Sequence, residues 1–433
     1  MTTITILGTG MAGLGAAYCA SHENVKTVLY EKNNHPGGHT ASWTSPEGFV
    51  FDEGPHISFT KDKRIQAIFA DSIDGGLEQF SAYVNNRWQG QWIKHPAQCN
   101  LHGLPVDLVT KILSDFTNAQ YTEPGEINNY ADWLIASYGK TFAQTFPMEY
   151  GLRYHTATAD KMSTDWLGPR LYRPEIDEII KGALTSETDD VHYISEFRYP
   201  TKGGFAGFLH KLLAGLDVKL SHRLVKLNPN EKTLKFENGS EVKYEHLVSS
   251  IPLPELIPMI VGVPDDVLAA ASQLACTTCI TVNIGVARED ISPAHWTYFY
   301  DRDYIFTRLS FPHMFSPHCT PDGCGSIQAE IYFSKKYKPV DRTPDECIEP
   351  VIKDLQRCGL LREDDEILFK DSRLIEYANV IFDLDRKDAL NIVHGYLDDI
   401  NVHCAGRYGR WGYHWTDESF KSGESAVKNI LGQ

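Results

Sequence analysis

The chain has 433 residues, of which 42% are hydrophobic, 11% aromatic and 23% charged. One domain commonly takes about 100–200 residues, so this length predicts two or three domains. The composition is typical of a globular protein and argues against a disordered, collagen-like or membrane-spanning chain. The formal net charge of −16 argues against nucleic acid or an anionic membrane as a partner, although local arginines can still bind a small anion.

The N-terminus shows no basic segment ahead of an apolar one, so we expect no signal peptide and a cytoplasmic protein. The nine cysteines, an odd number spread along the chain, favour a reducing compartment over a disulfide framework. Cys276 and Cys279 form a lone CxxC in a stretch, residues 277–286, that predicts a buried strand. No second cysteine or histidine pair follows at zinc spacing. We therefore expect core packing, with metal binding or redox chemistry as the weaker alternative.

The first 31 residues follow the pattern of a βαβ unit. A strand at residues 3–7 is followed by the glycine turn Gly8-x-Gly10-x-x-Gly13 and a helix at residues 11–20. A second strand at residues 25–30 ends at the acid Glu31. Gly8 permits a tight turn, Gly10 lets the backbone approach a pyrophosphate, and Gly13 lets the helix pack on the strand. The helix N-terminus favours negative charge, and Glu31 is placed to bind a ribose hydroxyl. These features predict a Rossmann-type dinucleotide-binding domain.

Further elements follow from periodicity and turn residues. Gln89-Gly90 predicts a hairpin between aromatic strands. Three β segments are expected at residues 218–220, 234–236 and 247–250, and Asn238-Gly239 among them predicts a second hairpin turn. Residues 104–190 show mostly helical spacing, whereas residues 275–335 alternate β-branched and aromatic residues as in an antiparallel sheet. A last strand at 402–405 and a helix from about Thr416 are expected to return to the first domain.

A second glycine pair points to the identity of the dinucleotide. Soon after Glu31 the chain continues as Pro36-Gly37-Gly38-His39-Thr40. This resembles the large flavoprotein group that contains amine oxidases, protoporphyrinogen oxidase and UDP-galactopyranose mutase, in which the segment also wraps the diphosphate of FAD. The resemblance implies FAD as cofactor. The alternative is an ordinary surface turn.

Within that group, several segments in chain order resemble UDP-galactopyranose mutases, most closely the eukaryotic type. They are residues 46–59, 91–100, 161–170, 197–204, 406–413 and 419–420. Together they touch nearly the full length of the chain, which makes them more specific than any single motif.

The resemblance implies roles for individual residues. Those expected to hold FAD are Gly8, Gly10, Met11, Ala12, Gly13, Glu31, Lys32, Gly37, Gly38, His39, Thr40, His56, Gly406, Arg407, Thr416 and Asp417. Those expected at the substrate are Gln98, Arg170, Tyr298, Tyr300, Arg308, Asn379 and Tyr413. Among all of these, His56, Arg170 and Arg308 are the expected catalytic residues, and no metal ligands are expected.

The two arginines suit a diphosphate, because a guanidinium fork matches phosphate oxygens in a bidentate way. Each residue also has an ordinary interpretation. Arg170 can be a solvated helix residue, His56 a hydrogen-bonded core histidine, and Tyr413 a packing residue. Arg308 sits between apparently buried neighbours, where a guanidinium needs a partner.

Two departures from the mutase pattern bear on the sugar and the reaction. Asn379 stands where the mutases carry a tyrosine that helps hold the substrate phosphate, with Tyr377 close by. The segment between Tyr413 and Phe420 is also about two residues shorter than in eukaryotic-type mutases.

The leading hypothesis is a flavin-dependent nucleotide-sugar pyranose–furanose mutase that acts on a substrate such as UDP-galactose, as in polysaccharide biosynthesis. The resemblance implies that N5 of the reduced flavin is the covalent catalyst, with NADPH or NADH as reductant. One alternative is an FAD-dependent oxidoreductase of the amine oxidase type. The other is a non-catalytic flavin-binding protein. The oligomeric state is open, and a homo-oligomer is compatible with the sequence.

The expected fold class is α/β: a Rossmann-type FAD-binding domain, an antiparallel-sheet substrate domain and a helical insertion. The FAD-binding domain is expected at residues 1–60, 197–270 and 394–433, the substrate sheet at 61–95 and 271–393, and the helical insertion at 96–196.

Overall fold

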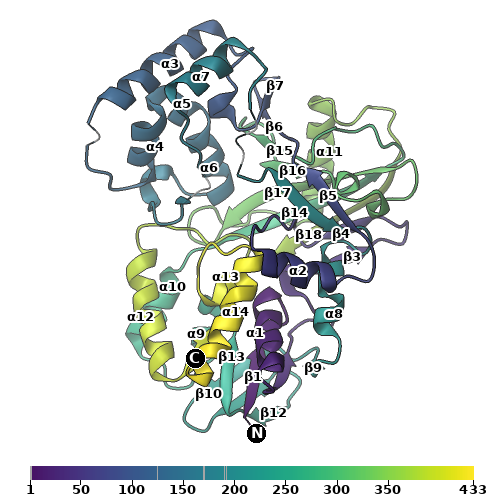
Figure 1. Cartoon of the computed structure of the whole chain (residues 1–433), viewed down its shortest axis with the longest axis vertical. Coiled ribbons are helices and arrows are strands. Elements are labelled where there is room, and N and C mark those ends of the chain that lie inside the picture. Colours follow the sequence, from purple (N-terminus) through teal and green to yellow (C-terminus); the bar gives the residue numbers. More distant parts are fainter. Residues whose placement is uncertain (1, 124, 169–170, 190, 192) are drawn as a thin grey trace.

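The computed structural model describes residues 2–123, 125–168, 171–189, 191 and 193–433. Three parts are visible in Figure 1: a helical part at the top, a large sheet beside and below it, and a parallel sheet with its helices at the bottom. This α/β architecture confirms the expected fold class. The domain limits themselves stay a prediction.

The lower part is built on a five-stranded parallel sheet in the order β19-β13-β1-β2-β9. Its strands are β1 (Thr3–Leu7), β2 (Lys26–Tyr30), β9 (Val218–Lys219), β13 (His246–Ser249) and β19 (Val402–Cys404). Residues Ile4 to Leu7 of the central strand are buried, as expected for a strand covered on both faces.

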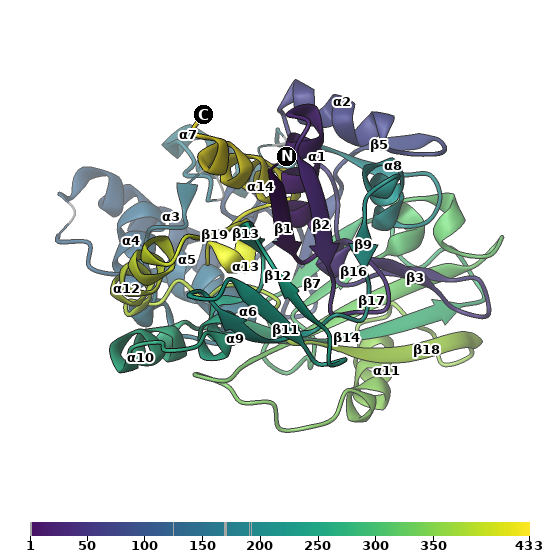
Figure 2. The ribbon, with the colours of Figure 1, turned by 90° about the horizontal axis from the view of Figure 1, so that it is seen from below.

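Two helices from opposite ends of the chain pack together on this sheet. They are α1 (Met11–His22) and α14 (Thr416–Leu431), which lie side by side in both ribbon views (Figures 1 and 2). A Cβ added at Gly423 of α14 would meet the Ala12 carbonyl oxygen at 1.9 Å, so the two backbones approach closely. The C-terminal strand and helix thus return to the first domain, as predicted.

The second sheet has seven strands in the order β18-β14-β17-β16-β15-β6-β7. Its strands are β6 (Val84–Trp88), β7 (Gln91–Lys94), β14 (Thr277–Val286), β15 (Trp296–Phe299), β16 (Arg308–Ser310), β17 (Gly325–Ser334) and β18 (Ile367–Ile375). All pairings are antiparallel except that of β15 with β6. Every residue of β14 and β17 is buried. The predicted hairpin turn at Gln89-Gly90 is confirmed, with positive φ at both residues.

The helical part covers one end of this sheet. Its helices are α3 (Val106–Tyr121), α4 (Tyr130–Tyr138), α5 (Lys140–Thr145), α6 (Pro147–His155) and α7 (Ile176–Leu184). Ile112 and Phe116 of α3 pack with Leu134, Phe142 and Phe146 in one buried cluster. Helix α6 lies closest to the sheet and carries residues that reach the site described below.

Smaller elements complete the chain. The other strands are β3 (Ser42–Thr44), β4 (Val50–Asp52), β5 (Leu77–Ser81), β8 (Glu196–Pro200), β10 (Leu224–Asn228), β11 (Thr233–Phe236) and β12 (Glu241–Lys243). The other helices are α2 (Lys63–Asp71), α8 (His210–Leu213), α9 (Leu253–Met259), α10 (Asp265–Gln273), α11 (Ile348–Arg357), α12 (Arg386–Asp399) and α13 (Gly406–Gly409).

The predicted hairpin at Asn238-Gly239 joins β11 to β12. Strands β10 and β18 lie outside the β segments expected from the sequence. Strand β18 runs at the edge of its sheet, where Lys370 and Arg373 are exposed, and its sequence lacks the apolar alternation that marks a half-buried strand.

The cysteine pair behaves as core. Cys276 is partly buried and Cys279 fully buried, and their odd separation in extended chain directs them to opposite sides. Among the described residues, no group of three or more His, Cys, Asp or Glu side chains is placed to hold a metal ion. The residues that the structure describes also contain no helix that is both long and apolar enough to cross a bilayer.

Candidate functional site

An elongated cavity of about 560 Å³ runs from the glycine turns of the parallel sheet to the inner face of the seven-stranded sheet. It starts beyond the carboxyl ends of β1 and β2, where ligands of open α/β sheets bind. The two ends of this cavity differ in how they are built. We call them the cradle, made by the glycine turns, and the wall, made by side chains of β16 and β17.

The cradle is formed by two backbone turns that face each other. A Cβ at Gly38 would lie 3.3 Å from the Gly10 Cα, and a Cβ at Gly10 would lie 3.7 Å from the Gly37 carbonyl oxygen. At Gly13 a Cβ would lie 2.0 Å from the Gly8 carbonyl oxygen. Gly13 and Gly38 therefore require glycine, whereas at Gly10 the missing Cβ keeps the space between the two turns open. The N–H groups at the start of α1 point to this space.

Glu31 ties these turns together. Its buried carboxylate accepts hydrogen bonds from the Thr9 backbone N–H at 3.0 Å and the Thr9 hydroxyl at 2.7 Å, and its other oxygen accepts from the Asn33 N–H at 3.0 Å. The Thr9 hydroxyl in turn accepts from the Gly37 N–H at 3.2 Å. Glu31 also lines the cavity beside Lys32, where the acid of a dinucleotide-binding fold meets the ribose.

These residues fit a dinucleotide. Helix α1 starts at Gly10 with no side-chain cap and no acid in its first turn, so its positive end is open to a pyrophosphate. The cavity also continues past Arg223, Leu224 and Met259, which leaves room for a nucleobase. That subsite was not found from the sequence, because β10 was not expected.

The C-terminal segment closes the cradle from the other side. Gly406 adopts φ +78° and donates its N–H to the Ser422 hydroxyl at 2.7 Å, and Arg407 and Thr416 line the cavity. Met11, Ala12, His39 and Thr40 line it as well. The Asp417 carboxylate instead accepts from the Thr60 hydroxyl at 2.7 Å and is not among the lining residues.

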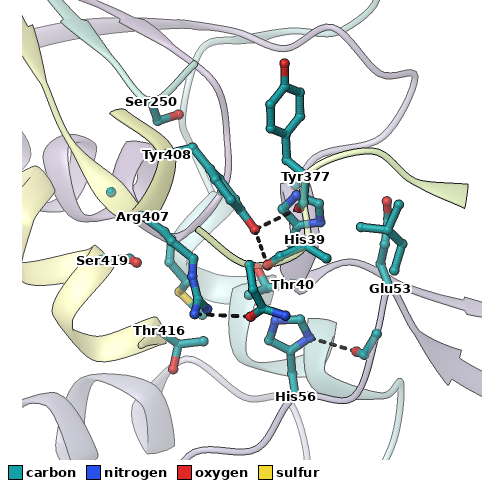
Figure 3. Close-up of a pocket in the computed structure, with 18 of the residues that line it drawn as sticks. His39, Thr40, Glu53, His56, Ser250, Tyr377, Arg407, Tyr408, Thr416 and Ser419 are labelled. Carbon is teal, nitrogen blue, oxygen red and sulfur yellow. Dashed lines mark hydrogen bonds between the residues drawn. The ribbon is translucent and has the colours of Figure 1, made fainter. Parts of the chain in front are cut away.

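Two histidines lie in the middle of the cavity (Figure 3). Burial first, and then the nearby cations of Arg407 and Arg308, lower the pKa of His56 to about 4. Burial and the neighbouring His56 lower the pKa of His39 to about 3. The Nδ1 atom of His56 lies 2.8 Å from the Gly54 carbonyl oxygen. Both imidazoles are therefore neutral at pH 7.

Asn379 and Arg407 form a pair in the lining of the cavity. One guanidinium nitrogen of Arg407 donates to the Asn379 side-chain oxygen at 3.4 Å, and the guanidinium lies 4.5 Å from the centre of the Tyr413 ring. Among the described residues, no carboxylate forms an ion pair with Arg407, and its Nε has no hydrogen-bond partner. A partly buried cation without a counter-charge favours an anionic ligand.

Arg308 belongs to the wall and is held differently. It lies directly opposite Glu330 in the β16–β17 register, and two of its nitrogens donate to the two carboxylate oxygens. The Tyr332 hydroxyl donates to the same carboxylate at 2.7 Å. Burial alone disfavours the Arg308 cation, but Glu330 outweighs this, so the pKa of Arg308 lies above its ordinary value.

The structure brings several of the predicted substrate residues together. Tyr298, Arg308, Asn379 and Tyr413 all line the cavity. Gln98 does not: its amide donates to the Tyr172 carbonyl oxygen at 3.0 Å. Tyr300 also lies off the lining, packed against the rings of Phe146 and Tyr150. The remaining predicted residue, Arg170, falls outside the described part of the chain.

Other side chains of the site were missed from the sequence. Glu330 and Tyr332 belong to the wall, and Tyr154 of α6 lines the cavity with its ring against Tyr332. The one available signal was Glu330, a charge inside an otherwise uncharged stretch of ten residues, GSIQAEIYFS. A buried charge needs a partner, but the sequence alone does not say which.

Arg153 of α6 was also missed and supports the wall from behind. Its guanidinium donates to the Phe299 carbonyl oxygen at 2.6 Å, to the Tyr304 carbonyl oxygen at 2.7 Å and to the Phe306 carbonyl oxygen. These carbonyls belong to the β15–β16 hairpin, which carries Arg308. Burial lowers the pKa of Arg153 to about 10, which leaves it charged at pH 7.

Comparison with solved structures places the chain near known flavoproteins. The crystal structure of a reduced UDP-galactopyranose mutase matches with a TM-score of 0.94 and 25% identity, over 100% of this chain and 94% of that one. A putative protoporphyrinogen oxidase from Exiguobacterium sp. 255-15 matches with a TM-score of 0.78 and 16% identity, over 100% of this chain and 99% of that one. At this lower identity the likeness shows the fold alone.

Comparison by sequence gives a shorter match and a family. The 4,4'-diaponeurosporene oxygenase of Staphylococcus aureus strain USA300 is 34% identical over 90 residues, which span 21% of this chain and only 17% of that protein. The model of the family described as flavin containing amine oxidoreductase matches residues 11–431. This membership and the mutase likeness imply FAD as cofactor. Because the family model matches residues 11–431, the chain belongs to the flavin containing amine oxidoreductase family.

Proposed function

We propose that the protein is a flavin-dependent nucleotide-sugar pyranose–furanose mutase. The observation that carries this proposal is a single cavity that joins a dinucleotide cradle to two partly buried arginines, Arg308 and Arg407. The likeness to a reduced UDP-galactopyranose mutase over the full length of the chain supports it. The substrate would be a nucleoside-diphosphate sugar such as UDP-galactose.

Each part of the site has a role in this reaction. A bound, reduced flavin supplies the nucleophilic centre for covalent catalysis at the sugar. Arg407 has no carboxylate partner among the described residues, and its charge is available to a diphosphate. Arg308 and Glu330 form a rigid charged pair beside it, so the leaving diphosphate is held rather than released. Neutral His56 adds no third charge near pH 7.

The choice of NADPH or NADH as reductant, the domain limits, a cytoplasmic location and a homo-oligomeric state stay predictions. Arg170 also remains a proposed diphosphate ligand, on the resemblance alone.

An amine oxidase-type oxidoreductase is a second candidate. The family match and the aromatic side chains Phe59, Tyr193 and Trp415 along the cavity favour it. The Arg407 cation, which pairs with no carboxylate among the described residues, opposes it, because it repels a protonated amine. Oxygen consumption with an amine, independent of prior reduction, would support this candidate.

The test is anaerobic turnover. Protein reduced with dithionite or NADPH is incubated with the furanose forms of UDP- and dTDP-galactose, and the products are separated by chromatography. We expect interconversion by the reduced protein and none by the oxidised protein. Arg308→Met should abolish it. Arg302→Met is the control, since Arg302 is an exposed residue of the same hairpin that pairs with Glu149. Failure of the reduced protein on every sugar would reject the proposal.

A further inference from the structure

Part of the lining of the cavity consists of hydrocarbon and aromatic side chains. We call it the aromatic lobe and define it by Phe59, Tyr193, Ile194, Trp296, Phe315 and Trp415. The Tyr193 and Trp415 rings are stacked at 5.8 Å, and Phe59 meets the Trp415 ring edge-on at 4.7 Å. Ile194, Trp296 and Phe315 are buried members of one hydrophobic cluster. The lobe is therefore part of the core surface and not an accidental surface groove.

The lobe lies where a ligand would meet the cofactor. Phe59 follows three residues after His56, and Trp415 directly precedes Thr416 at the start of α14. On the other side, the Trp296 indole N–H donates to the Tyr298 hydroxyl at 3.0 Å, and Tyr298 lies opposite Arg308 in the β15–β16 register. A molecule whose diphosphate is held at the arginines thus presents its adjoining group to this lobe.

The chemistry of the lobe selects against hydroxyl groups. Among its described members, only the Tyr193 hydroxyl and the two indole N–H groups are polar. Each buried sugar hydroxyl needs a hydrogen-bond partner, and one left without a partner weakens binding. Aromatic rings and Ile194 instead suit C–H groups and a methyl. The polar groups of Asn379, Arg407 and His56 line the same cavity outside the lobe, and they can satisfy ring hydroxyls.

We propose that the preferred substrate is a nucleoside-diphosphate 6-deoxyhexose, with the methyl that replaces the hydroxymethyl group in the aromatic lobe. This inference rests on the proposed mutase function and narrows its substrate class. The hydroxymethyl group is the largest substituent of a hexopyranose, and removal of its oxygen yields the apolar group that this lobe fits. The competing occupant is the nucleobase, which would stack on Tyr193 and Trp415.

The experiment compares two ligands that differ by one oxygen. The FAD-loaded protein is titrated with UDP-galactose and UDP-6-deoxygalactose, and with the matching dTDP pair, while Kd is measured from the shift in melting temperature. We expect about 10- to 100-fold tighter binding of the deoxy sugar within each pair, the usual discrimination by a hydrophobic pocket against an added hydroxyl. Equal affinities, or tighter binding of galactose, would overturn the proposal.

Two variants then test whether the preference for the deoxy sugar arises in the aromatic lobe. Ile194→Asn and Phe59→Tyr each add a polar group to the lobe and should reduce the deoxy preference several-fold, with binding of free UDP and dTDP unchanged. Leu368→Asn is the control, because Leu368 is exposed on β18 and does not line the cavity. Loss of free-nucleotide binding in either lobe variant, provided that it retains FAD, would place the base in the lobe and refute the proposal.

Binding and turnover separate the two proposals. A deoxy preference in Kd without interconversion of any sugar supports the lobe assignment and rejects the mutase function. Interconversion without a preference for the deoxy sugar in Kd or in kcat/KM supports the mutase function and rejects the lobe assignment.

Discussion

The cradle and the wall of the cavity are built by different physical means. The cradle is made of backbone: glycines 8, 10, 13, 37 and 38 and the N-terminus of α1, all within the first 40 residues. The wall is made of charged side chains that meet only through the sheet. The comparison teaches that the cradle depends on the absence of atoms, since a single Cβ fills it. The wall depends on charge balance, so a substitution there disrupts it by leaving a charge unpaired and not by a steric clash.

The cradle should show the largest effect. In Gly13→Ala the new Cβ would lie 2.0 Å from the Gly8 carbonyl oxygen, a backbone atom that cannot move without displacing the turn. We expect protein that is unfolded or free of flavin, measured as the ratio of FAD absorbance to protein.

Gly395→Ala is the matched control for this variant. Gly395 lies in α12 with nothing within 4 Å of an added Cβ, so we expect normal FAD content and stability raised by about 0.5–1 kcal/mol. Stoichiometric FAD in Gly13→Ala would contradict the view that the cradle is set by missing atoms.

The wall should respond through its charge. Arg308→Met leaves the Glu330 carboxylate buried without its cation, and loss of one partner of a buried pair costs about 3–5 kcal/mol. The free energy of unfolding is measured in urea. In the double variant Arg308→Met with Glu330→Gln, we expect most of the stability to return while nucleotide-sugar binding stays lost. A single variant as stable as the wild type would show that the pair does not define the wall.

This contrast also explains what the sequence could predict. The spacing of Gly8, Gly10 and Gly13 and the acid at Glu31 are local signals, so the cradle and its βαβ unit were predicted correctly in outline. The partner of Arg308 was not. Glu330 lies 22 residues away, and only the register of β16 with β17 sets the two side chains face to face.

The centre of the cavity was harder still. Asn379 was noted as a departure from the mutase pattern, but its contact with Arg407 joins two segments that meet only in the folded chain. The sequence also placed Gln98 and Tyr300 at the substrate, whereas neither lines the cavity described here. Their roles stay predictions. Short motifs fix the type of a residue and its neighbours along the chain, but not the direction of a side chain.

A smaller effect is expected behind the wall. Arg153→Met removes a cation that donates to three carbonyl oxygens of the β15–β16 hairpin, which then lack partners. Hydrogen bonds from charged groups stabilise by about 1.5–3 kcal/mol each and are not additive, so we expect a loss of about 2–4 kcal/mol.

Because Arg153 positions the hairpin that carries Arg308, its loss should also raise KM for the nucleotide sugar more than it lowers kcat. Arg302→Met tests the same hairpin at an exposed ion pair and should change stability by less than about 1 kcal/mol. A loss in Arg302→Met as large as that in Arg153→Met would show that the hairpin is sensitive throughout.

The smallest effect concerns the histidines between cradle and wall. The folded-state pKa of His56, about 4, lies below the value of about 6.5 for an exposed histidine, so protonation favours the unfolded chain. Its contribution to stability is complete above pH 6.5, declines between pH 6.5 and 4, and is lost below that range. In FAD-free protein, the free energy of unfolding of wild type should therefore change with pH by up to about 3 kcal/mol more across this window than that of His56→Gln. The measurement is Tm as a function of pH, and we expect a flatter curve for the variant.

Other groups titrate near the same range and make the comparison with wild type necessary, among them His295 and His313, whose pKa values burial lowers to about 4. His39, with a pKa of about 3, acts in the same direction. Burial raises the pKa of Asp52 to about 6, so protonation of this carboxyl below pH 6 favours the folded chain and opposes the histidines. All of these groups are present in wild type and variant, so the difference between the two curves isolates His56. The exposed His318 provides the control His318→Gln, which should leave the curve unchanged. If His56→Gln also leaves the curve unchanged, His56 is solvated in the FAD-free cavity. Water then reaches the region between cradle and wall more freely than the burial of His56 indicates.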